Sequence, residues 1–348
     1  MDRDKVWAFL ERFTGFASGF TTIGLLALAD RTGLLAVMAG GAPMPAAEAA
    51  ERSGVDRRYA EEILSGLAAA EVVDYDPGTG AFRLQPEHAA VIADDASPYS
   101  MGGWLDLLPA LVERLPDLVS VAETGDGVAH SAYDDRVVAG IDRANSPGIR
   151  ILLTRRWLPT MPDVVDRLER GGRVVDIGCG SGTAAVTMAT AYPDTEVLGV
   201  DIDELSIERA RSRSSDVPNI TFVTGDASEL PADPPFDLVT AFDVVHDLPQ
   251  PRATLLAVRG ALAPGGVFLM MEPNVADDLE DNLNSRAALL YGVSTMFCMT
   301  QSLAQGGAGL GAAWGPSQAK ELCREAGFGS FQRLPIDNPF SAFYRVEA

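Results

Sequence analysis

The most constraining feature of the chain is an apolar strand pattern that runs directly into three closely spaced glycines, Val174-Val-Asp-Ile-Gly-Cys-Gly-Ser-Gly-Thr183. Glycines at 178, 180 and 182 let the backbone turn sharply and approach a ligand closely. A helix that starts here offers free N–H groups at its N-terminus. The dinucleotide fingerprint G-x-G-x-x-G needs a glycine at position 183, where this chain has Thr. The spacing therefore predicts a ligand-binding turn that fits a pyrophosphate poorly.

From Arg173 onward, short apolar runs alternate with segments of helical spacing. This alternation is typical of a parallel sheet with crossover helices. We expect strands at 173–177, 196–200, 220–223, 236–241, 266–271, 330–335 and 340–346, and helices at 182–191, 204–215, 250–263 and 317–326.

Acidic residues follow three successive strands after the glycine turn. Asp201 closes one run, Asp226 follows the next, and Asp243 comes directly after Phe242. Ligands of open α/β sheets bind at the carboxyl ends of the strands. A carboxylate at Asp201 can accept both ribose hydroxyls of a nucleoside, and Asp226 can accept from an adenine amino group. The end of the fourth strand, Phe242 and Asp243, is expected beside the ligand.

Together, five motifs resemble the class I S-adenosylmethionine (SAM)-dependent methyltransferases over about residues 165–348: Asp176-Ile-Gly-Cys-Gly-Ser-Gly182, Gly199-Val-Asp-Ile202, Gly225-Asp-Ala227, Phe236-Asp-Leu-Val239 and Leu262-Ala-Pro-Gly-Gly266. The resemblance implies a Rossmann-like α/β fold, with a seven-stranded sheet whose last strand is antiparallel. It also implies SAM as the cofactor, with the glycines under its methionine part, Asp201 on the ribose, and Asp226 with Ala227 on the adenine. The predicted cofactor-binding residues are Asp176, Gly178, Gly180, Gly182, Asp201, Ile202, Asp226, Ala227, Phe242 and Asp243, and no metal ligand is expected.

His246 is the candidate catalytic residue. It follows the fourth strand, close to the expected position of the methyl group, and the unperturbed histidine pKa near 6.5 suits a general base. Its segment resembles that of O-methyltransferases whose catalytic histidine is followed by Asp and Trp; here Asp247 matches, and Leu248 replaces the tryptophan. By the same resemblance, Glu272 is the first acidic partner of the histidine, and no second partner is found between Ser294 and Pro316. A helix-start or packing role for His246 stays open.

The sequence of the N-terminal region predicts helices followed by a two-stranded wing. Asp56 is the expected N-cap of a helix over 57–70, and strand-like runs at 71–75 and 81–84 flank a turn. This order is that of a winged helix-turn-helix, and together with the helices that follow it resembles small-molecule methyltransferases that dimerise through an N-terminal domain. We expect a dimerisation domain over 1–95, a helical linker contributing to the substrate pocket over 96–165, and a SAM-binding domain over 166–348.

Composition restricts the partners and the compartment. The net charge is −22, and the wing region 43–87 carries nine acidic residues against four arginines, so nucleic acid is not expected as a partner. The apolar stretch Phe16–Met38 is broken by Asp30 and Arg31 and is interpreted as a pair of packed helices rather than a membrane span. Three cysteines without a close-spaced pair fit neither a disulfide framework nor a zinc site and favour the cytoplasm.

Residues 273–316 form an insertion that we interpret as a lid. It holds an apolar stretch over 287–299 and a glycine-rich tract over 306–311, which we expect to be mobile and able to hinge. Large side chains suited to an apolar, aromatic acceptor occur here and in the linker: Trp104, Tyr133, Tyr291, Met296 and Trp314.

The favoured function is methyl transfer from SAM to a small-molecule hydroxyl, with His246 as general base. The alternatives are N- or C-methylation without a base, a SAM-binding catalyst that does not methylate (such as a cyclase), and a winged-helix transcription regulator. The last is disfavoured because a DNA-reading helix should be basic, and an NAD-linked oxidoreductase is disfavoured by Thr183.

Overall fold

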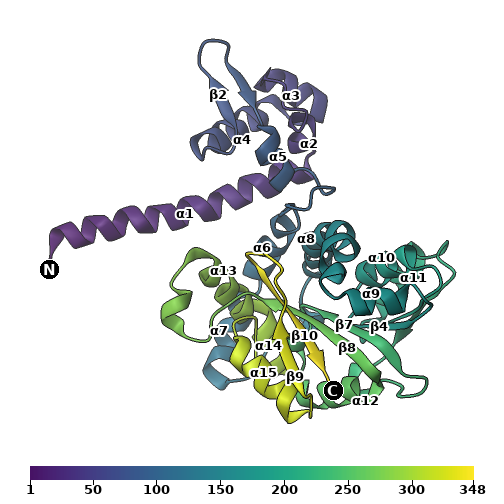
Figure 1. The fold of residues 1–348 in the computed structure, drawn as a ribbon. Helices are drawn as coiled ribbons and strands as arrows, with labels where there is room; N and C mark the ends of the chain where they lie inside the picture. The colour runs from purple at the N-terminus through teal and green to yellow at the C-terminus, as the bar shows by residue number, and fades with distance from the viewer. The chain divides into compact units, whose positions relative to one another are not determined.

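The seven expected strands form one sheet in the computed structural model, which describes residues 1–348 (Figure 1). The strand order is β6-β5-β4-β7-β8-β10-β9. Strands β4 to β8 are parallel, and β10 runs antiparallel to both of its neighbours, which confirms the predicted fold. The strands are β4 (Arg173–Ile177), β5 (Glu196–Asp201), β6 (Ile220–Thr224), β7 (Phe236–Phe242), β8 (Leu262–Pro273), β9 (Ser330–Arg333) and β10 (Ser341–Glu347).

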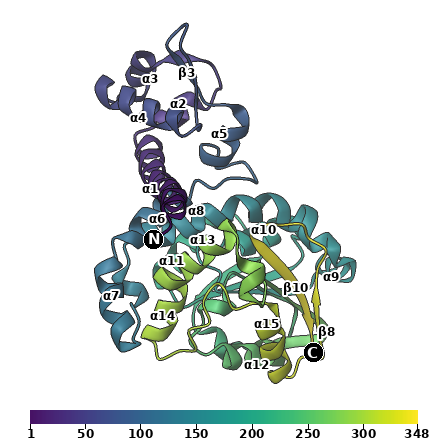
Figure 2. The same cartoon turned by 90° about the vertical axis from the view of Figure 1, so that its left-hand side faces the viewer.

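Helices cover both faces of this sheet because successive strand side chains alternate between the faces. Val174 and Leu238 face one core, against α9 (Pro162–Leu168), α10 (Thr183–Ala191) and α11 (Glu204–Arg213). Val175 and Val239 face the other, against α12 (Pro251–Ala261) and α15 (Pro316–Glu325), which lie side by side in Figure 2. These strands are apolar on both faces, as the central strands of a parallel sheet must be.

The insertion between β8 and α15 is mostly helical. It contains α13 (Ser285–Val293), one π-helical turn η7 (Ser294–Cys298) and α14 (Met299–Ala304). The glycine-rich tract that follows is tied to the segment after β7: Ala308 N–H donates to Pro249 O at 3.0 Å and Gly311 N–H to His246 O at 3.2 Å. The tract is thus hydrogen-bonded to the segment after β7 at two points, and a lid role for residues 273–316 stays a prediction.

The N-terminal region has the expected winged-helix order. Asp56 caps its helix by accepting from the backbone N–H groups of Arg58 and Tyr59. The wing has a third strand, Met44–Pro45, that was not predicted from the sequence because a two-residue strand gives no periodic signal. The elements are α2 (Leu34–Met38), β1 (Met44–Pro45), α3 (Ala46–Ser53), α4 (Arg57–Ala69), β2 (Asp74–Asp76), β3 (Ala81–Arg83) and α5 (Pro86–Ile92).

The first helix is longer than expected. α1 runs unbroken over Arg3–Arg31, and the chain turns at Gly33, whose φ is +75°, before the short α2 (Figure 1). The interpretation of Phe16–Met38 as a pair of packed helices is confirmed, since α1 and α2 pack in one core, but the first helix begins well before Phe16, at Arg3. By length and composition, α1 and the helix over Ser285–Ala304 could cross a membrane, which is weak evidence because core helices pass the same test.

The helices of the expected linker 96–165 are distributed between two compact units. Contacts divide the chain into one unit of residues 1–110 with 135–148 and another of 111–134 with 149–348. The linker helices are therefore shared: α6 (Trp104–Val112) and most of α8 (Asp135–Leu152) lie in the first unit, and α7 (Leu115–Thr124) in the second.

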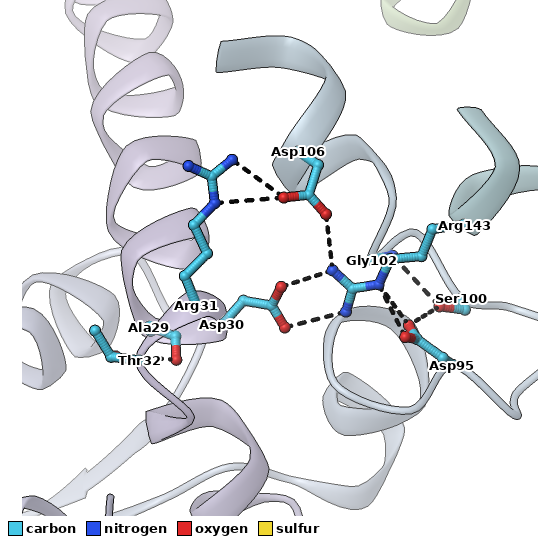
Figure 3. Close-up of polar contacts among 9 residues, drawn as sticks. All are labelled: Ala29, Asp30, Arg31, Thr32, Asp95, Ser100, Gly102, Asp106 and Arg143. Atoms are coloured by element: carbon cyan, nitrogen blue, oxygen red, sulfur yellow. Dashed lines mark hydrogen bonds and ion pairs between the residues drawn. The ribbon is translucent and has the colours of Figure 1, made fainter. Parts of the chain in front are cut away.

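Charged side chains explain why α6 and α8 join the first unit (Figure 3). Arg143 of α8 pairs with Asp30 of α1 at 2.6 Å, Asp95 at 2.8 Å and Asp106 of α6 at 3.1 Å. Arg31 also pairs with Asp106 at 3.1 Å. We name Asp30, Arg31, Asp95, Asp106 and Arg143 the Arg143 cluster. It links three helices that are far apart in sequence, a contact that no local pattern reveals.

Candidate active site

The glycine turn adopts the sharp, left-handed backbone that glycine permits. Gly178, Gly180 and Gly182 have φ values of +58°, +51° and +82°, a region that residues with a Cβ rarely enter. A Cβ at Gly178 would meet the Val244 side chain at 2.6 Å, whereas a Cβ at Gly180 would meet nothing within 4 Å. The turn therefore lies against the segment after β7 on one side and leaves open space beside Gly180.

Asp201 lies at the end of β5 and holds this turn. Its Oδ2 accepts from Gly180 N–H at 2.8 Å and its Oδ1 accepts from Asp203 N–H at 2.9 Å. Burial raises the pKa of Asp201 above its usual range. Ile202, directly after it, is 71% exposed, a large apolar surface at the strand end where a ligand is expected. The structure thus brings together Gly180 and Asp201, two of the predicted cofactor residues.

Asp226 lies at the end of the neighbouring strand. Gly225 N–H donates to Asp201 O at 2.9 Å, which keeps the two strand ends adjacent. The Asp226 carboxylate caps the short helix that starts at Ala227 by accepting from Ser228 N–H at 2.8 Å.

Asp176 is buried under the sheet's carboxyl edge. In the register of the parallel strands it lies opposite Thr240 of β7, whose hydroxyl donates to Asp176 Oδ1 at 2.6 Å. Burial outweighs this hydrogen bond and raises the pKa of Asp176 to about 7. Thr240 belongs to no recognisable motif, so its contact with Asp176 could not be predicted from the sequence.

The ends of β7 and β8 bring the candidate catalytic residues together. Phe242 pairs with Met271 across the strands, and Asp243 N–H donates to Met271 O at 2.9 Å. Asp243 has a φ of +57°, a strained conformation for a residue with a side chain, and strain of this kind clusters at functional sites. Burial raises the pKa of Asp243 to about 7. The half-buried Phe242 ring packs toward Trp157.

His246 and Glu272 are in contact. His246 Nδ1 lies 2.7 Å from Glu272 Oε2, and both residues are almost fully buried. Glu272 Oε2 also accepts from Trp314 Nε1–H at 3.0 Å, and Oε1 from Val245 N–H at 3.0 Å. A carboxylate surrounded by donors accepts the Nδ1 proton, which fixes the imidazole tautomer and leaves Nε2 for other chemistry.

On its other side, His246 faces Asp247 and Cys298. Nε2 lies 3.4 Å from Asp247 Oδ1, and Cys298 from the π-helical turn η7 hydrogen-bonds the imidazole. Burial disfavours the charged imidazole, but the carboxylates of Asp247 and Glu272 outweigh burial and raise the pKa of His246 well above 6.5. Burial also raises the pKa of the Cys298 thiol to about 12.

Two residues of this site were not assigned these positions from the sequence. Trp314 was expected to face an acceptor, but it is buried in the core and orients Glu272. Cys298 stands 52 positions after His246, and no spacing rule connects them. The signal that points to Cys298 comes from the structure: it lies on a π-helical turn, and such turns often occur at functional sites.

Comparison with known proteins identifies this architecture. A family model described as a methyltransferase domain matches residues 168–327. Residues 168–327 are a SAM-dependent methyltransferase domain of class I. A second model, described as an Rv2258c-like winged HTH domain, matches residues 21–94. The methyltransferase domain thus contains every predicted cofactor-binding residue, together with His246 and Glu272.

Curated relatives of this chain are also named as methyltransferases. The 27-O-demethylrifamycin SV methyltransferase of Amycolatopsis mediterranei is 33% identical over 174 residues, which are 49% of this chain and 57% of that protein. The chain spans about half the length of the curated relatives it matches.

Solved structures share the fold over nearly the whole chain. Human N-acetylserotonin methyltransferase in complex with SAM is 19% identical, with a TM-score of 0.67 and 97% of each chain covered. The mitomycin 7-O-methyltransferase MmcR is 16% identical, with a TM-score of 0.67 and 99% of each chain covered.

The residues present fit SAM. The positive φ values at the glycine turn and the open space beside Gly180 form a cradle that a ligand can approach. Three buried or half-buried carboxyls, those of Asp176, Asp201 and Asp243, gather at the same edge, and the pKa of each is raised by burial. SAM carries positive charge on its sulfonium and amino groups, so binding it would relieve this accumulation of acidic groups.

Proposed function

We propose that this protein transfers a methyl group from SAM to a hydroxyl of a small, largely apolar molecule, with His246 as the general base. The observation that carries the proposal is the 2.7 Å contact between His246 Nδ1 and Glu272 Oε2, beside the glycine turn. When bound, SAM supplies an electrophilic methyl group on a positively charged sulfur. Methyl transfer then needs in-line placement of the acceptor and removal of its proton.

Each site residue has a distinct role in this proposal. Gly178, Gly180 and Gly182 cradle the cofactor, Asp201 binds the ribose, and Asp226 with Ala227 binds the adenine. Glu272 holds the His246 ring so that Nε2, once it is deprotonated above the raised pKa of the imidazole, accepts the acceptor's proton. The remaining contacts would come from residues at the same edge: Asp176, Ile202, Phe242 and Asp243. The near-complete burial of His246 means that the acceptor reaches Nε2 only when the residues above it move.

The test is SAM turnover against a panel of phenols, carboxylic acids and amines, with S-adenosylhomocysteine and methylated product both measured. We expect methylated phenols or other hydroxyl compounds. His246→Gln should lower turnover about 100-fold or more while leaving SAM affinity unchanged. His88→Gln, a change at an exposed histidine of the other unit, is the matched control.

The alternatives give different results. Methylated amines with undiminished His246→Gln turnover would favour N-methylation without a base. Product formed without S-adenosylhomocysteine would favour a SAM-binding catalyst that does not methylate. A hydroxyl acceptor methylated at the wild-type rate by His246→Gln would remove the base assignment and leave the rest of the proposal intact.

The winged-helix domain is proposed as a dimerisation domain rather than a DNA reader. On α4, Arg57 pairs with Glu61 at 2.7 Å and Arg58 pairs with Glu62, so its arginines are already engaged by carboxylates. Phosphate binding would require breaking both pairs. A gel-shift assay with genomic fragments at low salt should give no retarded complex. The three free cysteines support a reducing cytoplasm as the compartment.

A further inference from the structure

The side of His246 that faces away from Glu272 holds three groups of different chemistry. A ring nitrogen of His246, a carboxylate oxygen of Asp247 and Sγ of Cys298 all lie within 4.8 Å of one another, and Nε2 is the ring nitrogen that contacts Asp247. They come from the short helix η5 (Val245–Asp247) and from the π-helical turn η7 of the insertion. Imidazole, carboxylate and thiolate are the three ligand types that bind zinc in proteins.

An unsatisfied atom lies in this cluster. Asp247 Oδ1 is buried and has no hydrogen-bond partner. A buried carboxylate oxygen without a donor is costly, and such atoms call for an explanation such as a bound ion. His246 Nε2 lies 3.4 Å from this oxygen.

The 3.4 Å between His246 Nε2 and Asp247 Oδ1 can be compared with the spacing of a hydrogen bond and with the spacing of two ligands on one metal ion. An N–H···O hydrogen bond usually spans about 2.7–3.2 Å, so this pair is longer than a good one. Two ligands on one tetrahedral zinc ion, with Zn–N near 2.05 Å and Zn–O near 2.1 Å, lie about 3.4 Å apart. The two atoms therefore have the spacing of shared metal ligands.

The surroundings of His246 complete the pattern. Metal-binding histidines usually donate their other ring N–H to a carboxylate, which fixes the tautomer and raises the basicity of the ligand nitrogen. Glu272 does this through Nδ1, and Trp314 and Val245 hold Glu272 in turn. Three protein ligands leave one position of a tetrahedral site for solvent.

We propose that His246, Asp247 and Cys298 form a Zn²⁺ site whose occupancy turns the enzyme off. Zinc binding releases the Cys298 thiol proton and the Nε2 proton of the imidazolium to solvent, so that a thiolate and a neutral imidazole bind the metal. The Nε2 lone pair that would accept the acceptor's proton is then bound to the metal. Inhibition therefore rests on the proposed base role of His246, whereas zinc binding rests on geometry alone.

Cobalt is the probe, because Co²⁺ replaces zinc and reports its ligands by its spectrum. Titrating the reduced full-length protein with Co²⁺ should give one equivalent of a four-coordinate spectrum with a thiolate-to-cobalt charge-transfer band, which Zn²⁺ then bleaches. Cys298→Ser should abolish that band and weaken Zn²⁺ binding more than about 100-fold, because removing a ligand costs more than removing an outer-shell partner. Cys323→Ser, a change at a buried cysteine outside this three-residue cluster, should leave the spectrum intact. Circular dichroism verifies that each variant is folded.

A six-coordinate spectrum without a thiolate band would overturn the site, since it would report only surface carboxylates of this acidic chain. A thiolate band that survives Cys298→Ser would do the same. These outcomes need no acceptor, so they are separate from any failure of the methylation assay. Once an acceptor is known, Zn²⁺ should inhibit turnover, a chelator should restore it, and Cys298→Ser should raise the inhibitory concentration more than about 100-fold. Turnover unaffected by saturating Zn²⁺ would overturn the inhibitory role.

Discussion

Asp176 is a carboxyl group whose surroundings favour its neutral form. It is 2% exposed, and burial raises its pKa to about 7, well above the usual 3.8 of an aspartic acid. Between pH 4 and 7 the folded state therefore binds more protons at this group than the unfolded state does. Stability from this group is present at low pH and falls as the pH rises toward 7.

Asp176→Asn should therefore remove the part of the pH dependence of the unfolding free energy that comes from Asp176. The amide keeps the acceptor for the Thr240 hydroxyl but cannot ionise. The free energy of unfolding of the variant minus that of the wild type should rise by on the order of 2 kcal/mol from pH 5 to pH 8. Urea unfolding at both pH values measures this. A constant difference between the two proteins across that range would show that Asp176 titrates normally.

Asp201 connects backbone geometry to cofactor binding. Its Oδ2 holds Gly180 N–H, so its removal both frees the turn and deletes the proposed ribose acceptor. Asp201→Ala should weaken SAM binding by about 100-fold, the equivalent of one or two hydrogen bonds to a charged group. Isothermal titration calorimetry measures this, with the exposed Asp216→Asn as the control. Unchanged affinity in Asp201→Ala would place the ribose elsewhere.

Motif-bearing residues of the site could be identified from the sequence, and partners of those residues could not. Asp201 and His246 are recognisable because they follow strands in a fixed order. Thr240 and Cys298 meet Asp176 and His246 only through strand register and through the path of a long insertion. Register and insertion paths are set by packing over the whole domain, which local periodicity does not encode.

Three helices of the first unit depend on the Arg143 cluster. One guanidinium pairs with three carboxylates, and its own side chain is 24% exposed, so the fork geometry of arginine matters more than its charge alone. Lysine offers one point charge and cannot form these pairs together.

Arg143→Lys and Arg143→Met should therefore both destabilise the first unit. We expect a loss of about 2 kcal/mol, below the 3–5 kcal/mol of a fully buried pair because solvent screens this one. Hydrogen exchange should increase at the ends of α1, α6 and α8 and stay unchanged in the central strands β4 and β7. Arg52→Met, which removes an exposed pair with Glu48, is the control. Equal exchange in Arg143→Met and Arg52→Met would show that the cluster contributes nothing.

Elements with strong periodicity were predicted within a few residues, and those defined by long-range contacts were not. β4 to β8 follow the expected runs because buried parallel strands are continuously apolar. The unit that each linker helix joins could not be predicted, because ion pairs and close helix packing decide it. A Cβ at Gly103 would overlap the backbone of Gly140 and Ala144, so these glycines let α6 and α8 approach closely.

The outward surface of α1 bears on the oligomeric state of the whole molecule. Val6, Phe9, Phe13, Phe16 and Phe20 recur at alternating intervals of three and four residues, the spacing of a coiled-coil seam. The four phenylalanines are 57–63% exposed in the single chain. Burying an apolar side chain of this size contributes about 1.5–3 kcal/mol, so a second copy that covers the seam would gain substantially.

We therefore expect a homodimer that forms through α1. Sedimentation should give a dimer for the wild type and a monomer for Phe13→Glu with Phe16→Glu, because charges within the seam would be desolvated. Ala8→Glu with Ser18→Glu adds the same charge outside the seam and should leave the dimer intact. Both variants should keep the wild-type circular dichroism, since the first twenty residues are almost entirely exposed in the single chain. A monomeric wild type that instead partitions into lipid vesicles would assign the apolar surface of α1 to a membrane, and a dimer that persists in Phe13→Glu with Phe16→Glu would place the interface on another surface.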